Sequence, residues 1–195
     1  MKRNIITAIL MTVVTTILCG AVYPLIVTGL AQLLFHDKAN GQLISQGGKL
    51  IGSRIIAQPF TGAGYFHPRG SAAGNGYDAA NSGGTNYGPT NQKLVDRVKT
   101  DVAAAQAENP AKSVPADYVT TSASGLDPDI SPANAAFQAP RVAKERGISE
   151  EQMMALVQQH TEERQFHILG EARVNVLELN LDLDSKFPLQ KRASR

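Results

Sequence analysis

The chain has 195 residues, with 19 lysines and arginines against 17 aspartates and glutamates. Lys2 and Arg3 precede a long apolar segment, so the rest of the chain carries 17 charges of each sign. A region without net charge lacks the basic face that binds nucleic acid phosphates. The single cysteine, Cys19, lies inside the apolar segment, which excludes a disulfide framework and a thiolate zinc site.

The 31 residues from Ile5 to Phe35 contain no aspartate, glutamate, lysine or arginine. A helix needs about 20 residues to cross a bilayer core of about 30 Å. Residues 1–36 are therefore predicted to form an N-terminal transmembrane helix, with the span at about residues 7–30. Positive charge beside a span is retained in the cytoplasm, so Lys2 and Arg3 predict a cytoplasmic N-terminus and an extracytoplasmic domain at residues 37–186.

A cleaved signal peptide is the alternative interpretation of this segment. The apolar region of a signal peptide normally covers about 7–15 residues. Here the sequence stays mostly apolar from Val22 to Phe35, beyond the small residues at positions 19–21. Leu18 also disfavours a lipoprotein site at Cys19, because such sites require a small residue before the cysteine.

Small residues recur every four positions within the span. Because positions four apart share one side of a helix, this row predicts a packing face for another membrane subunit. Small residues are also common in any membrane helix, so that alternative stays open. Pro24 predicts a kink, since proline lacks the backbone N–H. The four residues of the predicted packing face are Ala8, Thr12, Thr16 and Gly20.

The rest of the chain predicts one mixed α+β domain with a long glycine-rich loop. Two short strands at 42–44 and 50–57 flank Gly47-Gly48. Residues 61–90 hold eight glycines and predict an ordered loop. Apolar residues at intervals of three and four predict a helix over 91–107. A short strand is expected over 114–121.

The C-terminal part shows clear helix boundaries. Ser131-Pro132 predicts a helix start, Gly147 its end, and Pro140 a bend or split between them. Ser149 and Gln152 match a capping box.

The last predicted element is a strand. Leucines at 177, 179, 181 and 183 alternate with polar residues, which is typical of a strand with one solvated face. Residues 187–195 are expected to form a flexible tail.

The sequence contains no recognisable catalytic constellation. It has no Gly-x-Ser-x-Gly or His-Glu-x-x-His motif, and Gly48-Lys49 lacks the rest of a phosphate loop. The four histidines show no metal-ligand spacing, and His67 is interpreted as part of a surface contact patch. Asp127-Pro128-Asp129 favours a turn over a calcium site, because further oxygen ligands at loop spacing are missing. No catalytic residue, metal ligand or cofactor is expected on this chain.

Several loop strings, in their joint order and spacing, resemble the C subunit of the Kdp-type potassium-transporting ATPase of bacteria and archaea. The resemblance covers essentially the whole chain, including Tyr23-Pro24 in the span. The strings are GSRIIAQPFTGAGYFHPRGS (52–71), NSGGTN (81–86), GPTN (88–91), TSASGLDPDISP (121–132), QxxRVAKER (138–146) and VNVLELN (174–180).

The resemblance implies a non-catalytic accessory subunit of a high-affinity, ATP-driven potassium uptake complex in the bacterial inner membrane. Its partners would be a channel-like potassium-selecting subunit, a P-type ATPase subunit, a small single-span subunit and the lipid bilayer. Partner subunits would handle ATP and potassium. In this family, the C subunit is regarded as needed for the assembly and activity of the transport complex. A proposed role is that of a catalytic chaperone, which raises the ATP affinity of the ATP-hydrolysing subunit.

The resemblance also implies candidate sites in the loops. An alternative to subunit contact for Phe60 and Phe66 is that they only form a small core under the loop. Gly70 stands where the family usually has proline. The glycine-rich loop is open to two interpretations, a nucleotide contact or a structural turn. The candidate subunit contacts are Gln58, Phe60, Tyr65, Phe66, Arg69 and Ser71, and the glycine-rich loop consists of Ser82, Gly83, Gly84, Thr85 and Asn86.

Two functions of other classes stay open from the residues. One is a free-standing, membrane-anchored extracytoplasmic binding module or enzyme, whose domain would bind or turn over a ligand by itself. The other is a scaffold for some other membrane complex.

Overall fold

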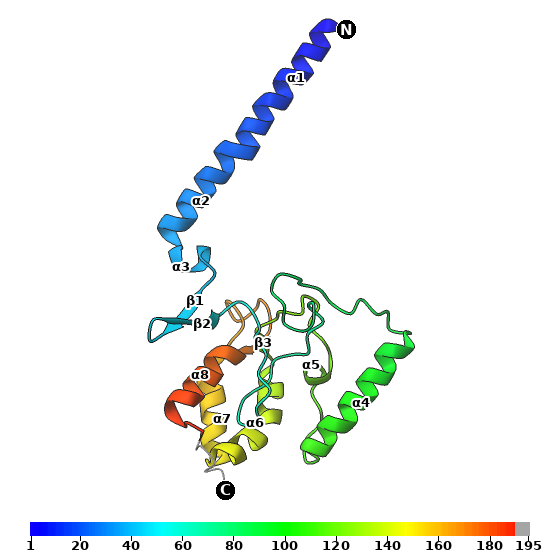
Figure 1. Cartoon of the computed structure of the whole chain (residues 1–195), viewed down its shortest axis with the longest axis vertical. Helices are drawn as coiled ribbons and strands as arrows, with labels where there is room; N and C mark the ends of the chain where they lie inside the picture. The colour runs from blue at the N-terminus through cyan, green and yellow to red at the C-terminus, as the bar shows by residue number, and fades with distance from the viewer. Residues whose placement is uncertain (190–195) are drawn as a thin grey trace. The chain divides into compact units, whose positions relative to one another are not determined.

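The structure, a computed structural model, describes residues 1–189 and divides the chain into two compact units, Met1–Leu43 and Ile44–Arg195 (Figure 1). The chain mixes helices and strands, as the sequence predicts. The predicted tail at 187–195 lies largely outside the described residues.

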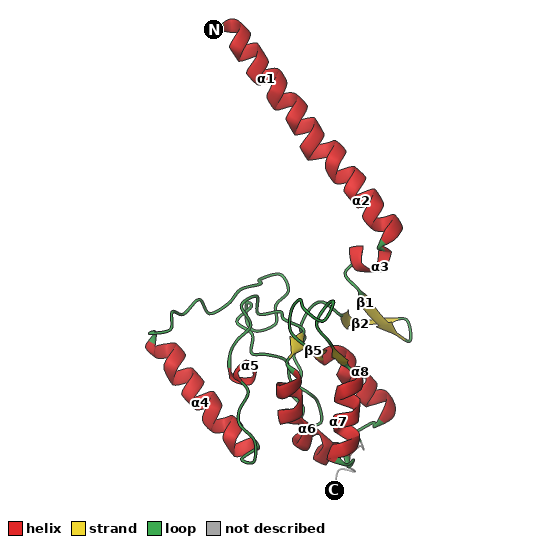
Figure 2. Ribbon diagram, turned by 180° about the vertical axis from the view of Figure 1, so that it is seen from behind, coloured by secondary structure: helices red, strands yellow, loops and turns green. Residues whose placement is uncertain are grey.

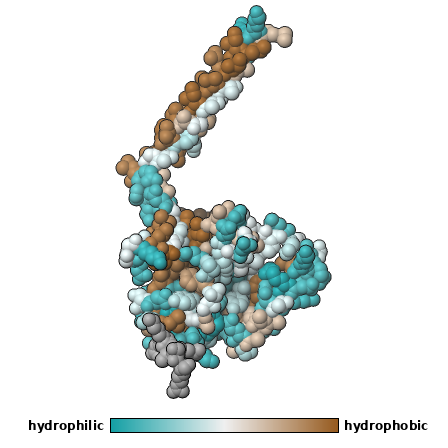
Figure 3. Space-filling view, viewed as in Figure 1, coloured by the Kyte–Doolittle hydropathy of each residue, from teal (hydrophilic) through white to brown (hydrophobic). Residues whose placement is uncertain are grey.

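The first unit is dominated by one helix from Lys2 to Leu34, which is long and apolar enough to cross a membrane. It consists of α1 (Lys2–Ile17), the π-helical turn η1 (Leu18–Val22) and α2 (Tyr23–Leu34), followed by the short α3 (His36–Ala39). None of the residues of α1, η1 and α2 is buried. Figure 3 shows apolar surface along this helix.

A π-helical turn occupies the place where the sequence predicts a kink. Pro24 lies at the start of α2 and has no N–H to donate to the preceding turn. The N–H of Tyr23 instead donates to the carbonyl of Leu18, five residues back. The helix accommodates proline by widening one turn.

The second unit combines helices with two small sheets. The β1–β2 pair forms one sheet, and β3–β5–β4 forms the other, with Val174 of β5 paired to Ile130 and Thr161 on its two antiparallel neighbours. Its elements are β1 (Leu43–Gln46), β2 (Lys49–Ser53), α4 (Gln92–Glu108), α5 (Ala116–Val119), β3 (Asp129–Ile130), α6 (Pro132–Arg146), α7 (Glu150–Gln159), β4 (Thr161–Glu162), β5 (Arg173–Asn175) and α8 (Val176–Lys186).

The main core lies among α6, α7 and α8, whose apolar side chains form one buried cluster (Figure 2). Its largest buried side chains include Phe66 from the long loop and Met153, Leu179 and Leu183 from the helices. A second, smaller cluster joins α4 to α6 through Ala105, Val119 and Phe137.

Several predicted helix boundaries are confirmed. Ser131 caps α6 by accepting a hydrogen bond from the N–H of Asn134 at 3.0 Å. Gly147 ends α6 in the left-handed conformation, with φ of 69°. Ser149 and Gln152 form both bonds of the capping box of α7. Helix α6 continues through Pro140, so the chain is not split there.

Two predicted strands are wrong. Residues 116–119 form the short helix α5 within the expected strand 114–121. The alternating leucine segment forms α8, which begins where the Asn175 side chain accepts a hydrogen bond from the N–H of Glu178. Leu179 and Leu183 are four residues apart, so they share the buried face of a helix. The intervening Asn180 is buried as well, so exposed and buried residues do not alternate along this segment.

Candidate functional site

The loop between β2 and α4 is the part of the second unit that carries most of the candidate residues. Residues 54–91 contain neither helix nor strand. Buried backbone groups still require hydrogen-bond partners, and here side chains supply them. The loop is therefore ordered by specific polar residues from distant elements.

Two buried amide side chains hold the loop backbone at Phe66 and His67. Asn180 of α8 accepts from the N–H of Phe66 and donates to its carbonyl, both at 2.9 Å. Gln138 of α6 accepts from the N–H of His67 at 2.8 Å and donates to its carbonyl at 3.0 Å. Each amide bonds the chain as a neighbouring strand would. These contacts place the Phe66 ring, which is 0% exposed, in the core.

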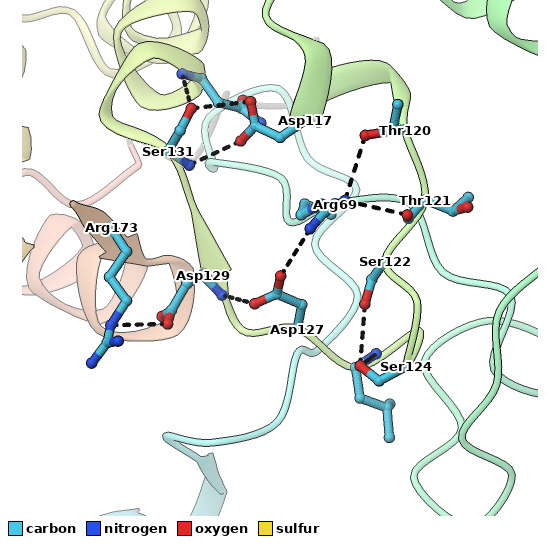
Figure 4. Close-up of polar contacts among 12 residues, drawn as sticks. Arg69, Asp117, Thr120, Thr121, Ser122, Ser124, Asp127, Asp129, Ser131 and Arg173 are labelled. Atoms are coloured by element: carbon cyan, nitrogen blue, oxygen red, sulfur yellow. Dashed lines mark hydrogen bonds and ion pairs between the residues drawn. The ribbon is translucent and has the colours of Figure 1, made fainter. Parts of the chain in front are cut away.

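Arg69 joins this loop to the segment that follows α5 (Figure 4). Its Nη1 lies 3.1 Å from a carboxylate oxygen of Asp127, and its Nη2 donates to the carbonyl of Thr121 at 3.3 Å. Its Nε is buried with no partner among residues 1–189. Arg69 is 26% exposed in its side chain, so its role in this arrangement is to hold two loops together.

Ser71 makes a second connection between the same loops. Its hydroxyl donates to the carbonyl of Gly125 at 2.6 Å and accepts from the N–H groups of Ala73 and Tyr77. The Tyr77 hydroxyl donates to the carbonyl of Arg69 at 2.9 Å. The hydroxyl of Ser71 thus fixes a turn by serving three backbone groups.

A pocket of about 520 Å³ is lined by Arg69 and several other charged residues. Within it, Arg173 pairs with Asp129 at 3.2 Å, and Asp117 accepts two hydrogen bonds from Ser131. Burial raises the pKa of the Asp129 carboxyl, which the guanidinium of Arg173 partly opposes. The charged lining residues are Arg69, Asp117, Asp127, Asp129, Glu171 and Arg173.

The charged groups of this pocket largely satisfy one another. Across the part of the chain that the structure describes, no group of three or more histidine, cysteine, aspartate or glutamate side chains could hold a metal ion. The pocket therefore holds two ion pairs, Arg69 with Asp127 and Arg173 with Asp129.

Three other candidate residues meet at a separate groove of about 450 Å³ lined by Gln58, Phe60 and Tyr65. The rings of Phe60 and Tyr65 have centroids 5.6 Å apart. Tyr65 also lies over the guanidinium of Arg146 at 4.8 Å and donates to Asp184 at 3.2 Å. Burial and the nearby Asp184 carboxylate raise the pKa of the Tyr65 hydroxyl.

The family comparison covers both units. The family model described as "KdpC: K+-transporting ATPase, c chain" matches residues 5–185. The chain belongs to the KdpC family.

Curated relatives agree with this assignment over nearly their whole lengths. The KdpC-family chain is 69% identical over 189 residues to the potassium-transporting ATPase KdpC subunit of Koribacter versatilis, covering 97% of this chain and 98% of that protein. The corresponding subunit of Rhodospirillum rubrum is 56% identical over 191 residues, with 97% and 99% covered. That of Myxococcus xanthus is 53% identical over 190 residues, with 96% and 90% covered.

In this KdpC-family chain the glycine-rich loop 82–86 lies against residues 123–124. The Ser82 hydroxyl and the N–H of Gly83 both donate to the carbonyl of Ser124 at 2.9 Å. A Cβ on Gly84 would lie 2.7 Å from the carbonyl oxygen of Ala123, so the close approach requires glycine. Asn86 adopts a positive φ of 53°. Thr85 is partly buried between them.

The four residues of the predicted packing face lie on the exposed helix of the first unit. Ala8, Thr12, Thr16 and Gly20 are all exposed. The Thr12 hydroxyl donates to the carbonyl of Ala8 at 2.9 Å, which satisfies it within the helix. Gly20 lies in the π-helical turn.

The sequence does not reveal which residues organise the loop between β2 and α4. Asn180 and Gln138 look like ordinary polar positions, and Arg146 looks like a solvated helix end. Arg146 is nevertheless 6% exposed, and its Nε donates to the carbonyl of Gly64 at 2.7 Å. Polar residues on the apolar faces of two helices are the signal that could have identified them.

Proposed function

We propose that this KdpC-family chain is a non-catalytic accessory subunit of a high-affinity, ATP-driven potassium uptake complex. The observation that carries the proposal is the family match over residues 5–185, which includes both the apolar helix and nearly all of the second unit. The helix from Lys2 to Leu34 lies in the bacterial inner membrane, the N-terminus is cytoplasmic, and residues 37–186 lie outside the cytoplasm.

The chemistry of the chain supports a role without catalysis. Ionisable residues inside a membrane mark ion pathways, and the span from Ile5 to Phe35 has no acidic or basic side chain. In the second unit, Arg69 and Arg173 are engaged with Asp127 and Asp129. Potassium selection and ATP hydrolysis therefore belong to other subunits of the complex.

The partners are a channel-like potassium-selecting subunit, a P-type ATPase subunit and a small single-span subunit. In the membrane, Ala8, Thr12, Thr16 and Gly20 provide a surface where another helix can approach closely. In the second unit, the groove at Gln58, Phe60 and Tyr65 presents aromatic side chains, which supply much of the energy at protein interfaces.

The other candidate contacts support this surface from within the unit. Phe66 is 0% exposed and anchors the loop, whereas Arg69 and Ser71 fix its path. Their substitution acts on docking through the shape of the loop.

The effect of the chain on ATP is indirect. An extracytoplasmic domain is separated from cytoplasmic ATP by the bilayer. The loop 82–86 also has a structural use, because Ser82 and Gly83 bond to Ser124. A chaperone effect on ATP affinity then arises when the chain stabilises one arrangement of the membrane subunits.

The decisive experiment compares potassium uptake and ATP hydrolysis in membranes with and without this chain. We expect loss of high-affinity uptake without it, and a lower half-saturating ATP concentration when full-length chain is restored. Uptake that is normal without the chain would contradict the accessory role. An unchanged half-saturating ATP concentration, with uptake restored, would contradict only the chaperone role.

The topology has its own test. In a Cys19→Ser background, Gln158→Cys places one thiol on the exposed surface of α7. A membrane-impermeant maleimide added to the extracytoplasmic side should label this thiol in intact cells or spheroplasts. Labelling only after the membrane is opened would place the domain in the cytoplasm.

A further inference from the structure

The loop between β4 and β5 carries a strongly exposed apolar surface. Phe166 is 82% exposed, Ile168 76% and Leu169 57%. These three residues, here called the apolar tip, lie together within four positions of the second unit. The cores of this unit do not include them. Large exposed apolar side chains concentrated in one short loop are typical of an interaction site.

The backbone holds the apolar tip in a defined shape. Gln165 and Leu169 exchange two backbone hydrogen bonds at 2.9 Å, and the N–H of His167 donates to the carbonyl of Arg164 at 3.0 Å. Arg164 and Glu171 form an ion pair at the base of the loop. A pre-formed loop loses little conformational entropy when it binds.

The same loop contains backbone strain. Phe166 and His167 have positive φ values of 54° and 60°, a region that favours glycine and asparagine. An aromatic residue in this conformation is unusual, and such strain concentrates at binding sites. The strained position is the one that presents the most exposed ring of the tip.

The charges around the tip favour a protein partner over an anionic lipid surface. Residues 161–173 contain three glutamates, Glu162, Glu163 and Glu171, against two arginines. Both arginines are paired, Arg164 with Glu171 and Arg173 with Glu162 and Asp129. Anionic lipid headgroups attract basic loops and repel a loop with net negative charge.

We propose that the apolar tip inserts into an apolar pocket on the extracytoplasmic face of a partner membrane subunit of the same ATPase complex. The inference rests on the proposed function, because it requires that the domain lie outside and that the chain belong to the complex. Three side chains form a small contact. The membrane helix makes the first contact with the complex and keeps the tip near its partner. The contact of the tip therefore forms at high effective concentration.

The test uses the assembled complex, captured through a tag on its ATP-hydrolysing subunit. Phe166→Asn with Ile168→Thr removes the two most exposed side chains of the apolar tip, and asparagine tolerates the positive φ. Leu169→Gln is a second variant at a position outside the left-handed region. The matched control is Met154→Gln, which removes an apolar side chain that is 36% exposed on α7.

The measured quantity is the rate at which the chain leaves the captured complex in dilute mild detergent. We expect the double variant to dissociate at least about tenfold faster than the wild type, Leu169→Gln to dissociate faster by a smaller factor, and Met154→Gln to match the wild type. Circular dichroism checks that each variant keeps its fold.

The outcomes separate the two proposals. Wild-type retention with equal retention of both tip variants overturns the inference and leaves the proposed function standing. Wild-type chain that is never captured overturns the proposed function and the inference together. Protein-free vesicles of neutral or anionic lipid provide the last comparison. If the tip variants leave the complex at the wild-type rate but bind such vesicles more weakly than the wild type, the tip binds membrane and the inference is wrong.

Discussion

Replacing Asn180 with leucine removes both hydrogen bonds that hold the loop backbone at Phe66. Asn180 is 1% exposed, and its amide both accepts from the N–H and donates to the carbonyl of Phe66 at 2.9 Å. Leucine has a similar volume, so the change mainly leaves two buried backbone groups without partners.

The magnitude follows from these two groups. Each buried polar group left unpaired costs about 1–3 kcal/mol, or roughly 2–6 kcal/mol for the pair. Burial of the leucine side chain offsets part of this cost. We expect a net loss of about 2–4 kcal/mol in the free energy of unfolding, a large share of the 5–15 kcal/mol typical of a domain.

Urea unfolding of the full chain in mild detergent, followed by the near-ultraviolet circular dichroism of its tyrosines, measures this loss. The matched control is Gln158→Leu, the loss of an exposed amide on α7, which should change the free energy of unfolding by less than about 0.5 kcal/mol. A loss below about 1 kcal/mol for Asn180→Leu would refute the view that its amide orders the loop.

Three further predictions test other parts of the account. Gly125→Ala should destabilise the second unit and expose its loops to proteolysis, because a Cβ there would lie 2.7 Å from Ala73 and φ is 71°. Arg69→Ala should reduce complex yield or potassium transport while the isolated chain stays folded, since it removes a partly exposed side chain with one ion pair to Asp127 and one hydrogen bond to Thr121. For Asp182, burial favours the neutral acid, but hydrogen bonds from a lysine and a histidine outweigh this and lower the pKa of the carboxyl group. Its stabilising effect should therefore be present at neutral pH and disappear as the pH falls below about 4, the ordinary value for aspartate.

Each of these predictions has a matched comparison. Gly147→Ala meets nothing within 4 Å at a similar φ of 69°, so it should cost much less than the change at Gly125. Arg97→Ala removes an arginine of similar exposure, 29%, from a helical ion pair and should leave complex yield unchanged. For Asp182→Asn, the difference from the wild type in unfolding free energy should shrink between pH 6 and pH 3. A constant difference would contradict the assigned pKa direction.

The sequence predicts the elements whose signals are local. The apolar helix, the Ser131 cap, the Gly147 end and the Ser149–Gln152 box depend on neighbouring residues, and each appears in the structure. The strand predicted at 177–183 is wrong, because Asn175 caps helix α8 there and the helix buries Leu179 and Leu183 on one face. Asn175 followed by glutamate three residues later is itself a helix-start signal.

The candidate site depends on contacts that no local pattern records. Phe66 pairs with a residue 114 positions away, and Arg69 with one 58 positions away. Composition can show that the loop has aromatics to bury, but it cannot show which amides hold it. The sequence therefore predicts that the loop is ordered, whereas the structure identifies Asn180 and Gln138 as the reason.

The central claim is that this KdpC-family chain works as part of a potassium-transporting complex. The most direct measurement is a mild-detergent purification of tagged full-length chain from its native membrane, with mass spectrometry of the proteins recovered. The account predicts a P-type ATPase subunit and a channel-like potassium subunit in fixed ratio to the chain. Recovery of the chain alone, together with intact potassium pumping in a strain that lacks it, would contradict the account.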